Sequence, residues 1–292
     1  MTVTVDIKGG IGNQIFQIAC ALEYSSRYNN KLILAKNLIN TNKHQHNDIN
    51  KTLSVIKILF PDIDIVDYID TKSYSIYEEK RDEAFKYIDI NKYFKENNIN
   101  TENILLTGYF ITEKYFPSKL LCNIVPSNMK NISNTISDFS NMYFIHIRLG
   151  DYVNSRLHSM NLEKYYTYCI NKIKEKDGMA KFIICTNEYS ENLYNYINNF
   201  PKNNTYILQD SKNDELDTLY IMSSCKGAIC ANSTLSWLGA YFQKDKDLDK
   251  DKGFIFMPYP FVNFKNSYNQ NNTLDVYPEW TQVYDITTNS LM

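Results

Sequence analysis

The sequence predicts an α/β fold with parallel sheets and crossover helices. From residue 143 onward, short apolar runs alternate with segments that have helical spacing, a pattern typical of strands joined by helices. The chain also opens with an alternating strand at 2–7, followed by a glycine-rich turn and a helix. A polar stretch rich in Asn and Ser at 128–141 lies between these regions, and we expect an inter-domain linker there.

The bulk composition is that of a globular protein. The 292 residues suffice for two modest domains or one large one, and 43% are hydrophobic while 22% are charged. A net charge of −2 implies no bulk attraction to nucleic acid or to anionic membranes. The six cysteines are scattered, the N-terminus lacks the features of a signal peptide, and no apolar run approaches the ~18 residues of a membrane helix. We therefore expect a cytoplasmic protein with reduced thiols and no transmembrane anchor.

Local patterns place the remaining elements of the first half. Apolar runs predict strands at 31–35 and 104–110, and helical spacing predicts helices at 15–22, 53–60 and 115–124. The glycine-rich turn at 9–14 joins the first strand to the first of these helices, an arrangement that aims free backbone N–H groups at an anion. It lacks the third glycine of a dinucleotide fingerprint and the lysine of a P-loop. It does supply two side-chain amides, Asn13 and Gln14, at the start of a helix, where Asn13 can also serve as a plain cap.

The stretch at 143–153, which reads Y-F-I-H-I-R-L-G-D-Y-V, carries charge at the end of an apolar strand. His146 and Arg148 alternate, so they are expected on one face of the strand. An unpaired buried guanidinium is very costly, so Arg148 needs either an internal acid or an opening to a ligand. Gly150 allows a sharp turn, and Asp151 can cap the segment that follows. Both interpretations, a phosphate site and a satisfied core pair, remain open on this stretch alone.

The second half continues with strands at 181–185, 205–209 and 228–231 and with helices at 162–176, 190–200 and 215–225. The segment 232–237 follows the last strand, and an apolar helix then runs through Phe242. Polar groups follow three of the strands: His/Arg, Asn/Glu and Ser/Thr. The carboxyl ends of parallel strands share one edge of the sheet, so these groups predict a nucleotide site. Arg148 suits the outer phosphate, and Ser233 and Thr234 add donors at a helix start. Glu188 can accept two bonds from guanine, or it caps the next helix.

Three acidic or histidine-containing stretches suggest metal sites, but none of them has the ligand pattern that such a site requires. His44 and His46 lie in a polar loop with no third ligand nearby. The D-x-D sequence at 62–64 is common by chance, and the acidic loop at 245–251 has Lys250 where a calcium loop needs glycine. We expect solvated loops in all three places and no metal or other cofactor.

Three motifs resemble those of the alpha-1,2-fucosyltransferases, which use GDP-fucose. The chain reads G-G-I-G-N-Q-I-F-Q-I-A at 9–19, H-I-R-L-G-D-Y at 146–152 and N-S-T-L-S-W-L-G-A at 232–240, in the order of the family. A weaker match, T-N-E at 186–188, stands where the family has S/T-D-D. Leu149 replaces a second Arg of the family, Asn187 replaces an Asp, and Leu238 replaces a Trp.

The resemblance implies a GT-B-like fold: two Rossmann-like halves, here 1–130 on the acceptor side and 140–292 on the donor side, with a cleft between them. It implies an inverting transfer of L-fucose from GDP-β-L-fucose to the 2-hydroxyl of a terminal galactose on a glycan, with no need for a metal. The protein would then be a hexosyltransferase, specifically a galactoside alpha-1,2-fucosyltransferase. The partners would be this donor and a glycan acceptor. The residues implied for donor binding are Gly10, Gly12, Asn13, Gln14, His146, Arg148, Glu188, Asn232, Ser233, Thr234 and Ser236.

An inverting transfer needs no enzyme nucleophile. We expect Arg148 to stabilise the leaving diphosphate, Asn13 to lie near the reacting sugar, and Asp151 or His158 to act as general base. The substitution at Leu149 leaves room for another GDP-deoxyhexose or GDP-mannose as donor. Two further hypotheses remain open: a protein that only binds GDP-sugars or glycans, and a metal-dependent enzyme that uses the D-x-D sequence.

Overall fold

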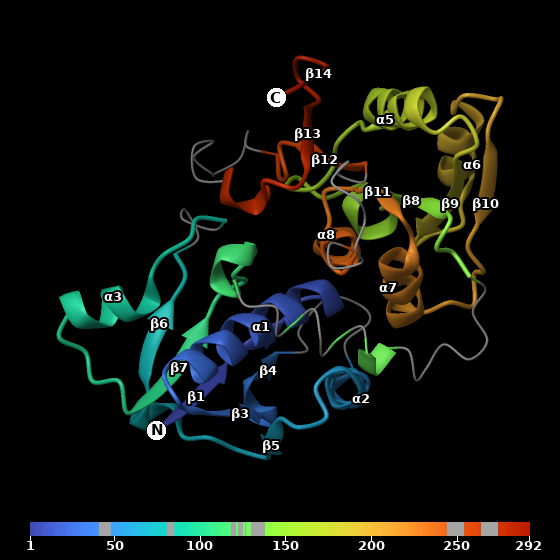
Figure 1. Ribbon diagram of the computed structural model, residues 1–292. Helices are drawn as coiled ribbons and strands as arrows, with labels where there is room; N and C mark the ends of the chain where they lie inside the picture. Colours follow the sequence, from blue (N-terminus) through green and yellow to red (C-terminus); the bar gives the residue numbers. More distant parts are fainter. Residues whose placement is uncertain are drawn as a thin grey trace. The chain divides into compact units, whose positions relative to one another are not determined.

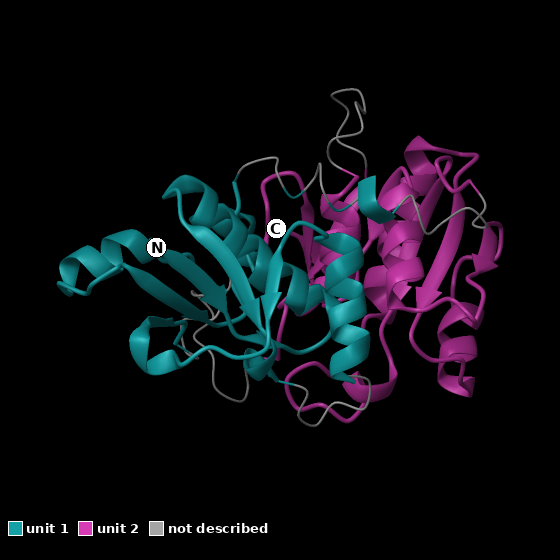
Figure 2. Ribbon diagram, turned by 90° about the horizontal axis from the view of Figure 1, so that it is seen from below, with its two compact units in different colours: residues 1–129, 268–276 teal, residues 130–267, 277–292 magenta. Residues whose placement is uncertain are grey.

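The computed structural model describes residues 1–40, 48–80, 85–117, 121, 125, 127–129, 138–243, 254–263 and 274–292. The loop with His44 and His46, Cys122 and the acidic loop at 245–251 lie outside the described residues, as do most of the expected helix at 115–124 and of the expected linker. The chain forms two compact units, 1–129 with 268–276 and 130–267 with 277–292 (Figure 2). The expected ranges, 1–130 and 140–292, differ from these units at 268–276, which belongs with unit 1.

Unit 1 is built on a parallel sheet with the strand order β5-β3-β1-β7-β6 (Figure 1). Its strands are β1 (Thr2–Val5), β3 (Lys31–Ala35), β5 (Asp64–Val66), β6 (Ser75–Glu78) and β7 (Asn103–Thr107). A short parallel pair joins β2 (Ile7–Lys8) to β4 (Ile39–Asn40). The helices are α1 (Ile11–Arg27), α2 (Ile49–Leu59) and α3 (Ile90–Glu96), and α1 packs on β1 and β3.

The structure refines two expectations for unit 1. Tyr115, where the expected helix at 115–124 begins, ends a short 3-10 turn, Glu113–Tyr115, and Leu121 in the same range is helical. Thr112 starts the turn by accepting a hydrogen bond from the backbone N–H of Lys114. The D-x-D sequence enters β5, where the Asp64 carboxylate lies 2.6 Å from Lys31 Nζ. Strand β6 and helix α3 had no predicted counterpart, because each is short and carries little periodicity.

Unit 2 is built on a larger sheet with the strand order β10-β9-β8-β11-β12-β13-β14, in which all pairs except β13–β14 are parallel. The strands are β8 (Met142–Ile147), β9 (Lys181–Thr186), β10 (Thr205–Leu208), β11 (Gly227–Ile229), β12 (Ile255–Tyr259), β13 (Gln282–Asp285) and β14 (Ser290–Leu291). The helices are α5 (Glu163–Lys176), α6 (Glu191–Asn198), α7 (Glu215–Ser224) and α8 (Thr234–Tyr241). The predicted α/β fold with parallel sheets and crossover helices is therefore confirmed.

Helix α5 fixes the ends of the central strands. All six residues of β8 are buried, as expected of a strand covered on both faces. The hydroxyl of Tyr166 donates to the carbonyl of His146 at 2.8 Å, and that of Tyr165 lies 2.8 Å from the carbonyl of Cys230 and 2.9 Å from that of Phe256. Buried carbonyls at strand ends need such donors. The two tyrosines thus hold in place the edge of the sheet on which the predicted nucleotide site lies.

The cysteines that the structure describes are free and buried: Cys20, Cys169, Cys185, Cys225 and Cys230. Burial raises the pKa of the Cys230 thiol, which donates to the carbonyl of Ser236. These groups act as small core residues.

Candidate active site

Arg148 follows the last residue of β8 and stands at the carboxyl edge of the sheet in unit 2. Its Nε lies 3.1 Å, and its terminal nitrogen 2.8 Å, from the same carboxylate oxygen of Asp151. The Asp151 side chain is 50% exposed and that of Arg148 is 21% exposed. The partner is thus a surface carboxylate within one turn, and the other N–H groups of the guanidinium have no partner among the described residues. This excludes the interpretation of Arg148 as half of an internal ion pair.

Tyr152 connects this turn to two other segments of unit 2. The guanidinium of Arg148 lies 5.1 Å from the centre of the Tyr152 ring, and the His158 ring stacks on it at 4.4 Å. Burial raises the pKa of the Tyr152 hydroxyl, a shift that the charge of Arg148 and the nearby side chain of Ser233, at the start of α8, oppose. Sequence reasoning did not select Tyr152 as a site residue, although it closes the central motif.

The end of β9 packs against the turn after β8. Gly150 has φ +60°, and a Cβ there would lie 3.0 Å from Asn187 Nδ2 and 3.1 Å from Glu188 Oε2. The Asn187 amide accepts from the backbone N–H of Leu149 at 2.9 Å and donates to its carbonyl at 3.3 Å. Both the left-handed conformation and the close approach require glycine here. The turn is therefore fixed against the carboxylate of Glu188.

The carboxylate of Glu188 makes no hydrogen bond to another described residue. Helix α6 begins after Ser190, whose side chain does not cap it, and the Glu188 backbone N–H instead bonds the Thr186 hydroxyl at 3.3 Å. The expected second role of Glu188, as a helix cap, is thus not seen. Its carboxylate remains available to a ligand that offers two donors.

His146 is enclosed in the core at the end of β8. It is 1% exposed, and its Nδ1 has no hydrogen-bond partner among the described residues. Burial, reinforced by the nearby charge of Arg148, lowers the pKa of the imidazole to about 3. The ring is therefore neutral at pH 7. Its burial contrasts with the partial exposure of the Arg148 side chain two residues further along.

The segment before α8 supplies backbone donors rather than a row of free hydroxyls. Trp237 is the first residue whose N–H bonds back into the helix, to Ser233, so the N–H groups of the first turn face outward. Ser236 is fully buried, and its hydroxyl lies 3.3 Å from the Ala231 carbonyl and 3.2 Å from that of Ser233. Asn232 is buried too and donates to the carbonyl of His158 at 3.0 Å. Thr234 is partly exposed at the first position of the helix.

The glycine turn of unit 1 forms a second open helix start. Gly9 has φ +81°, and a Cβ there would lie 2.5 Å from Asn13 Nδ2. Gln14 Nε2 donates to the Gly9 carbonyl at 2.9 Å, and Gln14 N–H is bonded to the Gly10 carbonyl. Gly10 is exposed, whereas Gly12 is buried in the first turn of α1 and Asn13 is partly exposed. The N-terminal N–H groups of α1 thus lie beside the Asn13 amide.

The structure therefore gathers the predicted residues into two sets, each within one unit. Unit 2 brings Arg148, Asp151 and Glu188 together with the start of α8, and unit 1 holds the four residues of the glycine turn. Asp151 is already paired with Arg148, and the His158 ring is stacked on Tyr152. Among the described residues, no cluster of three or more His, Cys, Asp or Glu side chains could hold a metal ion.

A parallel sheet whose carboxyl edge carries a guanidinium, a carboxylate and an open helix start is an arrangement with which α/β proteins bind nucleotides. The comparison with known families narrows this class. The chain belongs to glycosyl transferase family 11, whose family model matches residues 2–249. The predicted resemblance to the alpha-1,2-fucosyltransferase family is thus confirmed, and the protein is a glycosyltransferase of that family.

Two curated relatives are both from Escherichia coli. The chain is 27% identical over 303 residues to an alpha-1,2-colitosyltransferase, a match that covers 96% of this chain and 98% of the relative. It is 30% identical over 134 residues to the O-antigen biosynthesis glycosyltransferase WbnK, which covers 44% of this chain and 41% of the relative. The first of these relatives is thus named for the transfer of colitose.

Among solved structures, the chain is similar to POFUT1 in complex with GDP and to the fucosyltransferase NodZ from Bradyrhizobium. Both are 11% identical with a TM-score of 0.44; the matches cover 83% of this chain and 94% of POFUT1, and 81% of this chain and 90% of NodZ. No helix in the described part of the chain has the length and apolar character to cross a membrane.

Proposed function

We propose that this protein transfers a 6-deoxyhexose from its GDP-sugar to the 2-hydroxyl of a terminal galactose on a glycan, with inversion at the transferred carbon. L-Fucose is the first candidate donor sugar, in line with the family motifs. Colitose, which is L-fucose without its 3-hydroxyl, is the second, because a relative that covers nearly the whole chain is a colitosyltransferase.

The observation that supports this proposal most directly is the partly exposed guanidinium of Arg148 at the strand edge. A departing nucleoside diphosphate gains negative charge on its outer phosphate, and a guanidinium can donate to two of its oxygens at once. The outward N–H groups at the start of α8 add donors for the same charge. Such donors stabilise the transition state more than the ground state, which is the condition for catalysis.

Glu188 supports guanine as the base of the donor. Its carboxylate is unbonded within the described protein and lies against the Gly150 turn, close to Arg148 in the fold. Guanine presents two parallel donors, N1–H and N2–H₂, whereas adenine has no such pair. A carboxylate in this position therefore favours GDP over ADP.

Asp151 is the acid nearest to the leaving group, but its ion pair with Arg148 gives it a positioning role in the resting protein. Its salt bridge holds the guanidinium in one orientation, and half of the side chain is exposed. The proton of the acceptor hydroxyl can pass to this carboxylate or to His158 once the acceptor is bound.

The test is incubation of the purified protein with GDP-fucose, GDP-colitose or GDP-mannose and a panel of β-galactosides, with the product linkage read by NMR. We expect an α-1,2-linked deoxyhexose and full activity in EDTA. Turnover with GDP-mannose alone would contradict the deoxyhexose proposal, and tight GDP binding without consumption of any donor would mark a binding protein.

A further inference from the structure

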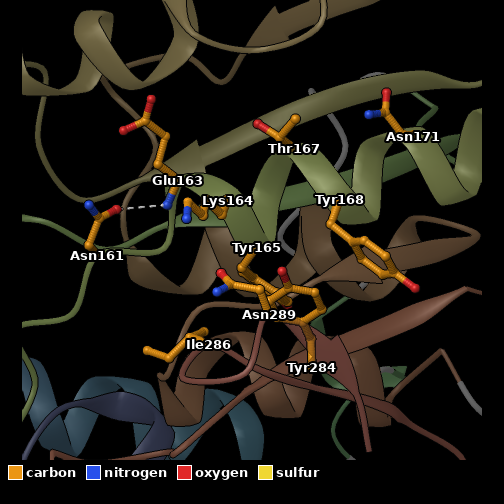
Figure 3. Close-up of a pocket in the computed structure, with 10 residues that line it drawn as sticks. All are labelled: Asn161, Glu163, Lys164, Tyr165, Thr167, Tyr168, Asn171, Tyr284, Ile286 and Asn289. Atoms are coloured by element: carbon orange, nitrogen blue, oxygen red, sulfur yellow. Dashed lines mark hydrogen bonds between the residues drawn. The ribbon is translucent and has the colours of Figure 1, made fainter.

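A pocket of about 620 Å³ lies in unit 2, apart from the residues assigned above. It is bounded by the first half of α5 and by the end of β13 with the turn toward β14 (Figure 3). Its volume falls within the range of small-molecule sites. None of its lining residues has a role in the proposed transfer.

Tyrosine rings form the apolar part of this pocket. Tyr284 of β13 is buried and lies 4.8 Å from the ring of Tyr168 on α5, at an interplanar angle of 41°. Tyr165, whose hydroxyl is already bonded to the strand ends, lies behind them. Tyr168 is only partly buried, and Figure 3 shows its ring projecting from α5 on the Tyr284 side. The pocket thus offers ring surface to an apolar face of a ligand.

Polar groups stand around these rings and are not used within the described protein. The side chains of Lys164 and Asn289 are exposed and make no hydrogen bond to another described residue. Asn161 accepts from the backbone N–H of Glu163 at 3.0 Å, which leaves its NH₂ group to donate. Asn289 sits at φ 56° in a turn tied by the Asp285 carboxylate, which accepts from Thr287 N–H at 2.7 Å. The backbone turn that carries Asn289 is therefore fixed by Asp285, while the Asn289 amide stays available to a ligand.

The charge of the lining argues against an anionic ligand. Lys164 is its single cation and Glu163 its single acid, so they offset each other, and Glu163 is held by Asn199 at 2.8 Å. A phosphate site would need an excess of cationic donors. Ring surface combined with neutral amides instead suits a molecule with one apolar face and many hydroxyl groups, which is the chemistry of a pyranose ring.

The pocket also lies along the edge that carries Arg148. Ile286 and Asn289 follow the carboxyl end of β13, which is three strands from β8 in the sheet order. At ~4.8 Å per strand, this is a separation of roughly 14 Å along the edge. We propose that the pocket binds a neutral sugar ring of the acceptor glycan, several rings away from the sugar that is modified. This inference rests on the proposed function, because it assigns the acceptor to the same protein.

The inference is tested by direct binding. Saturation-transfer NMR and calorimetry would use a neutral tetrasaccharide with a terminal β-galactose, and methyl β-galactoside as the short probe. The variants are Tyr168→Ala, which removes the ring, and Asn289→Gly, which removes the amide but keeps the left-handed turn. The matched controls are Tyr194→Ala and Asn195→Ala on α6, both exposed in the same unit and outside the pocket.

We expect each pocket variant to weaken tetrasaccharide binding about five- to tenfold, with the affinities for GDP and methyl β-galactoside unchanged, and both controls to behave as wild type. Asn289→Gly keeps the test decisive if Tyr168→Ala fails to fold. Equal affinity of wild type and both variants would overturn the inference while donor turnover still upheld the proposed function. Competition by guanosine at the same residues would overturn it in favour of a nucleobase site. A third outcome is that the variants lose tetrasaccharide binding while the wild-type protein consumes no donor. This result would uphold the pocket and overturn the proposed function.

Discussion

The turn after β2 in unit 1 and the turn after β8 in unit 2 use the same device. Each has a glycine with positive φ, Gly9 or Gly150, and in each a side-chain amide bonds both the N–H and the carbonyl of the preceding residue. Gln17 does this for Lys8 at 3.0 and 3.1 Å, and Asn187 does it for Leu149 at 2.9 and 3.3 Å. Two unlike sequences thus fix two turns at strand ends in the same way.

The two turns differ in what they present. Gln17 is fully buried and belongs to the helix that follows its turn, whereas Asn187 is exposed and comes from the neighbouring strand. The turn of unit 1 presents neutral amides and helix N–H groups, while that of unit 2 presents Arg148, Asp151 and Glu188. The same backbone geometry can therefore carry either neutral donors or charges, and the charges mark the donor side of the proposed reaction.

Removal of the guanidinium tests this difference most strongly. We expect Arg148→Ala to lower kcat by about 10³-fold, because a positioned donor to a developing charge contributes this much, while the free energy of unfolding stays near wild type. The measurement is donor consumption together with a urea melt. Arg27→Ala, on a surface helix of unit 1, is the control and should keep full activity. Near-normal kcat in Arg148→Ala would remove this residue from the mechanism.

Replacing each of the two amides by a carboxylate tests whether burial, rather than the shared backbone geometry, sets the cost of the change. Gln17→Glu places a carboxylate against the Lys8 carbonyl in a fully buried position, and we expect a loss of about 3 kcal/mol in unfolding free energy. Asn187→Asp makes the same change where solvent reaches the side chain, and should cost less than about 1 kcal/mol. Equal losses, measured by denaturant unfolding of both variants, would show that burial does not distinguish the two turns.

The buried His146, beside the turn of unit 2, makes the free energy of unfolding depend on pH. Its pKa is lowered to about 3 in the folded protein against an ordinary value of 6.5, so below pH 6.5 the unfolded chain binds a proton that the folded chain does not. Its contribution to stability is therefore complete above pH 6.5 and declines as the pH falls toward 3. Between pH 6.5 and 5 the loss is about 2 kcal/mol. His146→Gln should unfold with a correspondingly flatter pH profile; an identical slope in both proteins would contradict the buried neutral imidazole.

The glycine pair in unit 1 gives the smallest expected effect. Gly9→Ala forces an alanine to φ +81° and against Asn13, with a cost of about 1–2 kcal/mol from the backbone alone. Gly10→Ala enters open space at φ −72° and should change stability by less than about 0.5 kcal/mol. Urea unfolding of the Gly9→Ala and Gly10→Ala variants shows whether the loss of stability depends on the position of the glycine or on the substitution itself. A Gly10→Ala variant as unstable as Gly9→Ala would mean that the turn needs glycine for another reason.

Local residue patterns were sufficient to establish the α/β class and the position of Arg148 at the end of a strand. These follow from alternation, helical spacing and short motifs, all of which act over a few residues. Such patterns were least informative for short elements such as β6, α3 and the 3-10 turn Glu113–Tyr115. Alternation predicted a shared direction for His146 and Arg148 but left the burial of His146 open, because it does not record the depth of packing above a side chain.

Long-range packing settled which groups remain available for ligands. Leu149 and His146 are hydrogen-bonded to residues 38 and 20 positions away in the chain, Asn187 and Tyr166, and Asn232 is hydrogen-bonded to His158, 74 positions away. The tyrosine pocket likewise joins α5 to β13, far apart in the sequence. Hydrogen bonding and burial depend on such distant neighbours, whereas residue patterns record only local conformational preference. For this reason the residues of the candidate site could be proposed from the sequence, but the groups that hold them in place could not.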